Sequence, residues 1–148
     1  EDDHGVAFMD LRRNGSTMNI TRGGELYLSR RINTQLDPDV MQSVEWDSLK
    51  DRLVLEIQRS LDYYESQMGQ NQINRIVIVQ RQHDSTAMVE TLNGLLSAEV
   101  SVLNLAEHVK SGVELSSEDQ QVAMAAIGAT LRGSKKAGNA DKAKQEAA

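Results

Sequence analysis

The sequence contains no cysteine, only one proline, and a single phenylalanine and tryptophan among its 148 residues. The absence of cysteine excludes a disulfide framework, a thiolate zinc site and a cysteine nucleophile. Acidic residues outnumber basic ones by 22 to 16, so the formal net charge is −6. Because phosphate attraction needs clustered lysine and arginine, this balance argues against a nucleic-acid partner. The apolar runs are also far shorter than the roughly 18 residues of a membrane-spanning helix.

The two ends of the chain differ from the rest. The sequence starts Glu-Asp-Asp-His, without an initiating methionine or a signal-peptide pattern, so we expect a segment of a longer protein from a reducing compartment. Residues 133–148 hold four lysines, one aspartate and one glutamate, and no large apolar residue. A segment that cannot bury an apolar face does not fold alone. We therefore expect a single folded domain over residues 1–132 and a disordered basic tail over residues 133–148.

Three strand-like runs open the chain and are separated by turn signals. They cover residues 6–11, 16–22 and 25–32, with the sequences VAFMDL, STMNITR and ELYLSRRI. Asn14-Gly15 and Gly23-Gly24 lie between them, and such dipeptides supply the positive φ angles of tight hairpins. Alternation places Leu26 and Leu28 on one face of the third run and Tyr27 on the other. The pattern predicts an antiparallel meander of three strands.

A long helix is predicted over residues 47–68, because apolar residues recur there every three or four positions. The predicted inward face contains Leu49, Leu53, Ile57, Leu61, Tyr64 and Met68. Tyr63 lies off that face and is expected to be exposed. Gly69 follows as a stop signal, since glycine readily adopts the left-handed conformation that ends many helices.

Strands and helices alternate through the remaining sequence. Strands are predicted over residues 75–80 and 99–105, and a helix over residues 87–97 with Met88, Leu92, Leu95 and Leu96 facing inward. The S-x-x-D pattern at residues 116–119 is typical of a capping box before a third helix. The order β-β-β-α-β-α-β-α predicts an α/β fold with a mixed five-stranded sheet. Its first strand lies centrally, between the second and the fourth.

This order of elements resembles the ribonuclease-H-like unit, which actin-like ATPases use twice. Four stretches carry a closer resemblance: GVAFMDLRRNGSTMNITRGGELYLSRRI, EIQRSLDYYESQ, RIVIVQ and AMAAIGATLRG. In this order they are similar to the second half of PilM-type pilus proteins, and most of all to the MshI-like branch that serves MSHA pilus biogenesis. The likeness spans residues 4–133. It implies an actin-like fold with an ATP cleft between two halves, of which this chain is the second.

The resemblance also implies a phosphate-binding hairpin with an aspartate, a glycine and a threonine. Asp10 matches the acid, while Ser16 and Thr17 match the hydroxyls. Leu11-Arg12 replaces an Ile-Gly-like pair, and Arg12 blocks the close backbone approach to phosphate that glycine permits. Its guanidinium can still pair with phosphate. The candidate nucleotide-binding residues of this degenerate site are Asp10, Arg12, Asn14, Gly15, Ser16 and Thr17.

Two further observations argue against nucleotide use by this half. The resemblance implies that a glycine-rich loop after the fourth strand holds the adenosine. Here this loop reads VQRQHDST and has no glycine between Gln80 and Thr86, so its side chains would crowd a purine. Asn14-Gly15 fits an ordinary hairpin turn, and Asp10 fits an acid that hydrogen-bonds to that turn. We therefore expect no catalytic residue and no resident cofactor. ATP and magnesium stay possible ligands of the full-length protein only.

Other chemistries find little support in the sequence. His4, His83 and His108 are far apart and lack the spacing of metal ligands. The fourth strand ends without the acid that a two-metal nuclease needs. Neither a Gly-x-Ser-x-Gly elbow nor a P-loop motif is present.

The resemblance implies a non-catalytic cytoplasmic scaffold in type IV pilus biogenesis of the MSHA class. Its expected partners are inner-membrane pilus assembly proteins of the PilN-like kind and the N-terminal half of the same protein. The scaffold would then lie at the inner membrane through its partners. Two alternatives stay open, namely an ATP-binding switch domain of a PilM-like protein and a cytoplasmic scaffold of type II secretion.

Overall fold

A computed structural model describes residues 4–12, 15–34, 36, 40–79, 86–105, 116 and 119. The chain divides into two compact units, Glu1–Leu103 and Asn104–Ala148. The predicted single domain over residues 1–132 stays a prediction. The elements of the first unit are β1 (Val6–Asp10), β2 (Ser16–Arg22), β3 (Glu25–Ile32), the 3₁₀ turn η1 (Val40–Gln42), α1 (Trp46–Met68), β4 (Arg75–Val79), α2 (Thr86–Asn93) and β5 (Glu99–Val102).

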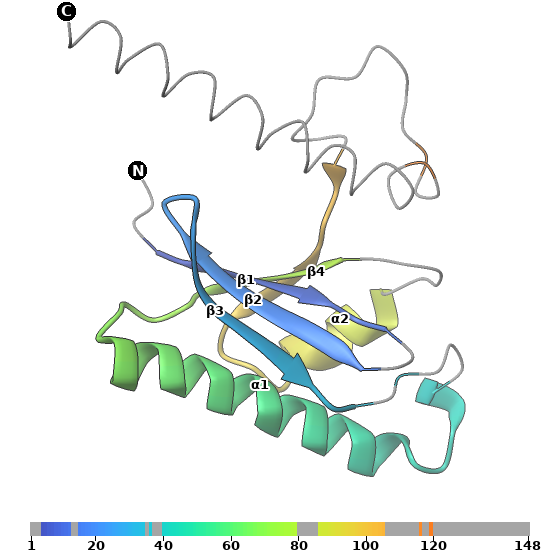
Figure 1. Ribbon diagram of the computed structural model, residues 1–148. Helices are drawn as coiled ribbons and strands as arrows, with labels where there is room; N and C mark the ends of the chain where they lie inside the picture. The colour runs from blue at the N-terminus through green and yellow to red at the C-terminus, as the bar shows by residue number, and fades with distance from the viewer. Residues whose placement is uncertain are drawn as a thin grey trace, which may run out of the picture. The chain divides into compact units, whose positions relative to one another are not determined.

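The five strands form one mixed sheet in the order β3-β2-β1-β4-β5 (Figure 1). β1 pairs antiparallel with β2 and parallel with β4, and β4 pairs parallel with β5. This arrangement confirms the predicted mixed five-stranded sheet and the central place of the first strand. The antiparallel half consists of the meander, because its tight turns can join only neighbouring antiparallel strands.

The helix α1 confirms the prediction from sequence periodicity. It ends at Gly69, whose φ of 60° is the left-handed conformation expected of a helix C-cap. Leu53, Ile57 and Tyr64 are completely buried, whereas Tyr63 is 48% exposed. Spacing of three and four residues therefore identified the face that packs on the sheet.

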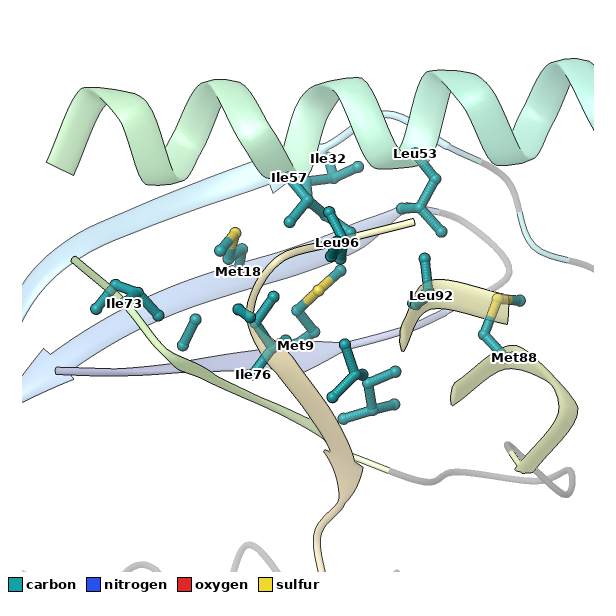
Figure 2. Packing of buried hydrophobic residues seen from close by; sticks show 14 of the residues in the cluster. Met9, Met18, Ile32, Leu53, Ile57, Ile73, Ile76, Met88, Leu92 and Leu96 are labelled. Atoms are coloured by element: carbon teal, nitrogen blue, oxygen red, sulfur yellow. The ribbon is translucent and has the colours of Figure 1, made fainter. Parts of the chain in front are cut away.

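The core lies between one face of the sheet and the two helices (Figure 2). Met9 and Met18 rise from the central strands toward Ile57 and Leu53 of α1, while Leu92 of α2 completes the layer. These side chains are fully buried, so each contributes roughly 1.5–3 kcal/mol through removal of apolar surface from water. No helix in the described ranges combines the length and hydropathy needed to cross a membrane.

The end of α2 differs from the prediction. The helix stops at Asn93 instead of reaching residue 97, because the Asn93 side chain forms two hydrogen bonds with the Val100 backbone. The bonds measure 2.8 Å from Nδ2 to the Val100 oxygen and 2.7 Å from the Val100 nitrogen to Oδ1. Leu95, expected to face inward, is consequently 44% exposed, while Leu96 is buried. β5 is also shorter than expected and ends at Val102.

A β-bulge in β3 overturns the predicted alternation of that strand. The register shifts by one between Ile20 and Thr21, whose partners are Leu28 and Leu26, so Tyr27 is the extra residue. Tyr27 and Leu28 therefore both pack against the core, and Leu26 is 61% exposed. Beyond the bulge, every β3 side chain lies on the face opposite to the one that an unbroken hairpin would give it.

The second unit confirms the predicted capping box. Ser116 Oγ donates to Asp119 Oδ2 at 2.6 Å and accepts from the Asp119 backbone nitrogen at 3.2 Å. The Ser116 nitrogen also donates to Asp119 Oδ2, at 3.2 Å. The rest of the predicted third helix, the tail over residues 133–148 and the loop over residues 80–85 lie outside the described residues.

Candidate functional site

The candidate hairpin site lies where β1 and β4 both end. Because these strands are parallel, their carboxyl ends reach the same edge of the sheet, with Asp10 opposite Val79. Open α/β sheets usually bind ligands at the carboxyl ends of their parallel strands. The turn from β1 to β2 leaves the sheet at this edge, so the fold brings the candidate residues to a place suited to binding.

Asp10 is held by its neighbour Arg12. Arg12 Nε and Nη2 donate to Asp10 Oδ2 at 2.8 and 2.5 Å, forming a fork on one carboxylate oxygen. The Asp10 side chain is 17% exposed and that of Arg12 is 59% exposed. An ion pair this open to solvent contributes at most about 1 kcal/mol to stability. Its consequence is chemical, because a cationic group of the chain itself already occupies Asp10 Oδ2.

The remaining candidates surround the start of β2. Thr17 lies directly opposite Asp10 in the β1–β2 ladder. Ser16 is completely buried, and its Oγ accepts a hydrogen bond of 3.4 Å from the Arg12 backbone nitrogen. Gly15 has a φ of 105°, a conformation that side chains rarely allow. Ser16 therefore closes the turn, while Thr17 shares a row with the acid. Asn14 lies outside the described residues.

Arg31 joins this group, although the sequence did not assign it to the hairpin site. It lies opposite Thr17 in the β2–β3 ladder, which gives a row of Asp10, Thr17 and Arg31 across three strands. A Cβ added to Gly15 would lie 3.1 Å from Arg31 Nε and 3.2 Å from Nη2, so the guanidinium packs directly on the turn. Counting back from the Gly23-Gly24 turn would instead place Arg30 opposite Thr17. Because the bulge at Tyr27 adds one residue to β3, Arg31 lies opposite Thr17 in place of Arg30.

The described part of the site combines two guanidinium groups with one carboxylate. Magnesium prefers oxygen ligands in octahedral geometry and is repelled by nearby cations. Asp10 is the sole carboxylate of the row and already accepts the Arg12 fork. Within the described ranges, no group of three acidic or histidine side chains could hold a metal ion. These residues do not fit a magnesium site, and their charges suit an anion better.

Comparisons with known proteins found similar structures but no similar sequence family. No family model matches the sequence, and a search of curated proteins gives no match. Among solved structures, a PilM-PilN type IV pilus biogenesis complex is similar at a TM-score of 0.54 and 14% identity, over 74% of this chain and 38% of that one. A ROK family transcriptional regulator, a homologue of E. coli MLC, is similar at 0.50 and 18% identity, over 68% of this chain and 28% of that one.

These likenesses establish the fold. The chain has the actin-like ATPase, or ribonuclease-H-like, fold, with the mixed sheet described above. It spans well under half the length of each solved chain. One of these chains belongs to a pilus complex and the other is a transcriptional regulator, so the fold itself is common to unrelated activities.

Proposed function

We propose that this chain is a non-catalytic scaffold domain of a type IV pilus assembly machine. The observation that carries the proposal is the Asp10–Arg12 ion pair at the strand edge of an actin-like fold. An ATPase of this fold needs that edge for magnesium and phosphate, and here a cation from the chain itself fills the place beside the acid. The likeness to the PilM-PilN complex supports the pilus assignment.

The finer parts of the proposal follow from the sequence resemblance. The pilus is of the MSHA class, the chain is the second half of an MshI-like protein, and its partners are PilN-like inner-membrane assembly proteins. The domain then works in the cytoplasm, held at the membrane by these partners. In this role the fold supplies a rigid surface, and the hairpin serves its structure instead of catalysis.

A nucleotide-dependent switch is the competing function, and two observations favour it. Gly15 keeps the positive φ of a tight turn, and Thr17 keeps its place beside Asp10. A hairpin of this kind can contact phosphate through backbone N–H groups. Because the exposed Asp10–Arg12 pair is weak, an anionic ligand could displace it without a large energetic cost.

Co-purification of the full-length protein tests the proposal. We expect it to associate with a PilN-type inner-membrane pilus protein equally well with Mg-ATP and with a chelator present. The Asp10→Ala variant should bind the same partner as strongly as the wild type, because the scaffold makes no use of the acid. Association that requires Mg-ATP and is lost in Asp10→Ala would establish the switch instead. Association with type II secretion proteins alone would refute the pilus assignment.

A further inference from the structure

The outer edge of β3 is a second surface of interest. β3 is eight residues long and lies at one end of the strand order, and within the described ranges no strand pairs with its outer side. Glu25, Ser29 and Arg31 are exposed along it. Every second residue of an edge strand presents backbone N–H and C=O groups outward, and an extended segment of another chain can pair with them.

The bulge limits the part of this edge that can pair regularly. From Leu28 to Ile32 the register with β2 is continuous, and the break lies at Tyr27. Five residues of strand extend over about 17 Å, which is enough for a short ladder with an added strand. The usable edge is therefore Leu28–Ile32, and we call this stretch the β3 edge.

Positive charge is concentrated at the β3 edge, although the protein is acidic overall. Arg30 and Arg31 lie within it on opposite faces of the sheet. On the α1 side, Arg30 Nη2 lies 3.4 Å from Glu56 Oε2, and Arg59 Nη1 lies 3.1 Å from the other oxygen of that carboxylate. Two guanidiniums thus share one acid next to the edge. A guanidinium has five N–H donors, so each can bind a further carboxylate.

This charge pattern selects between possible occupants. Two copies of the β3 edge paired antiparallel about its centre would place Arg30 directly opposite Arg30. Like charges facing each other across strands are destabilising. The bulge also interrupts any longer pairing of two copies. An incoming strand with carboxylates opposite Arg30 and Arg31 meets neither obstacle, because opposite charges in those positions attract.

We propose that the β3 edge binds an extended acidic segment of a partner protein by strand addition. Backbone hydrogen bonds to Leu28–Ile32 supply the pairing, and two adjacent acidic residues supply the specificity. One carboxylate faces Arg30 on the α1 side, and the next faces Arg31 on the other side. This surface shares Arg31 with the hairpin site, but the inference is independent of the function proposed above, because it requires neither a nucleotide nor a particular pilus class.

A peptide-display selection on the wild-type chain provides the probe. We expect the selected peptides to carry two adjacent Asp or Glu residues among β-branched ones. Hydrogen exchange should then show protection at alternate amides of Leu28–Ile32, since the others are already bonded to β2. That alternation distinguishes strand addition from contact through side chains alone.

Matched variants test the role of charge. The double variant Arg30→Gln with Arg31→Gln should weaken binding of the selected peptide about tenfold, because it removes two cross-strand charge pairs. Lys50→Gln with Arg75→Gln makes the same change in net charge outside the β3 edge and should leave binding unchanged, because Lys50 pairs with Asp47 and Arg75 lies on β4. Equal loss in both variants, selected peptides without acidic pairs, or protection outside β3 would overturn the proposal. Dimerisation of the free chain through β3 would assign the edge to a second copy instead.

Discussion

Replacing Tyr64 with alanine is expected to lower the free energy of unfolding by about 3–5 kcal/mol, the usual cost of deleting a buried aromatic side chain. Tyr64 is completely buried on α1, and its ring meets that of Tyr27 edge to face, with centroids 6.0 Å apart and planes at 86°. The alanine variant loses this contact and leaves a cavity between α1 and β3. Urea unfolding of the 148-residue chain followed by circular dichroism measures the change.

The adjacent residue provides the control for this measurement. Tyr63 is 48% exposed, so Tyr63→Ala should change the free energy of unfolding by no more than about 0.5 kcal/mol. Both substitutions remove the same atoms from the same helix and have the same effect on helix propensity. A loss at Tyr63 equal to that at Tyr64 would contradict the orientation of α1 on the sheet.

Gly5→Ala is expected to destabilise the fold by about 1–3 kcal/mol, because one methyl group overfills a packed site. A Cβ at Gly5 would lie 2.7 Å from Ile73 Cδ1, 3.0 Å from Tyr64 Oη and 3.2 Å from the Thr21 carbonyl oxygen. The Ile73 methyl group can move, whereas the Thr21 oxygen belongs to the sheet. Alanine normally stabilises a chain relative to glycine by restricting the unfolded state, so a loss here identifies the steric cause.

A double-mutant cycle with Ile73→Val isolates that cause. Valine lacks Cδ1, the atom nearest to the added methyl group. Ile73→Val alone should cost about 0.5–1.5 kcal/mol. The double variant should be more stable than the sum of the single effects predicts, by about 1 kcal/mol, because the two residues are in contact. Additive losses in thermal or urea unfolding would show that the Gly5 site is not limited by Ile73.

Local sequence patterns predicted the elements of the fold with good accuracy. The bounds of β2 and β3 agree with the predicted runs, and α1 begins one residue earlier than expected. These elements depend on alternation, helical spacing and turn residues, all of which are local. The end of α2 depends on the bonds between Asn93 and Val100, which form only after β5 has folded beside the helix. The apolar residues that follow Asn93 therefore suggested a longer helix.

The candidate site shows the same division between local and distant causes. The Asp10–Arg12 pair follows from two residues that lie on the same side of an extended chain, and the sequence had already identified both. The contact of Arg31 with Gly15 depends on the bulge at Tyr27. No turn-forming residue inside that strand indicates a bulge in the sequence. A one-residue error in register exchanges Arg30 and Arg31, so pattern alone could not assign Arg31 to the site.

Calorimetric titration of Mg-ATP into the full-length protein tests most directly whether this half serves as a scaffold without nucleotide. Because the described residues around Asp10 offer no ligand set for magnesium, we predict no saturable binding of Mg-ATP up to about 1 mM nucleotide, a limit near −4 kcal/mol of binding free energy. The Asp10→Ala variant should give the same flat titration. Micromolar binding by the wild type that disappears in Asp10→Ala would contradict the account and establish a working nucleotide site.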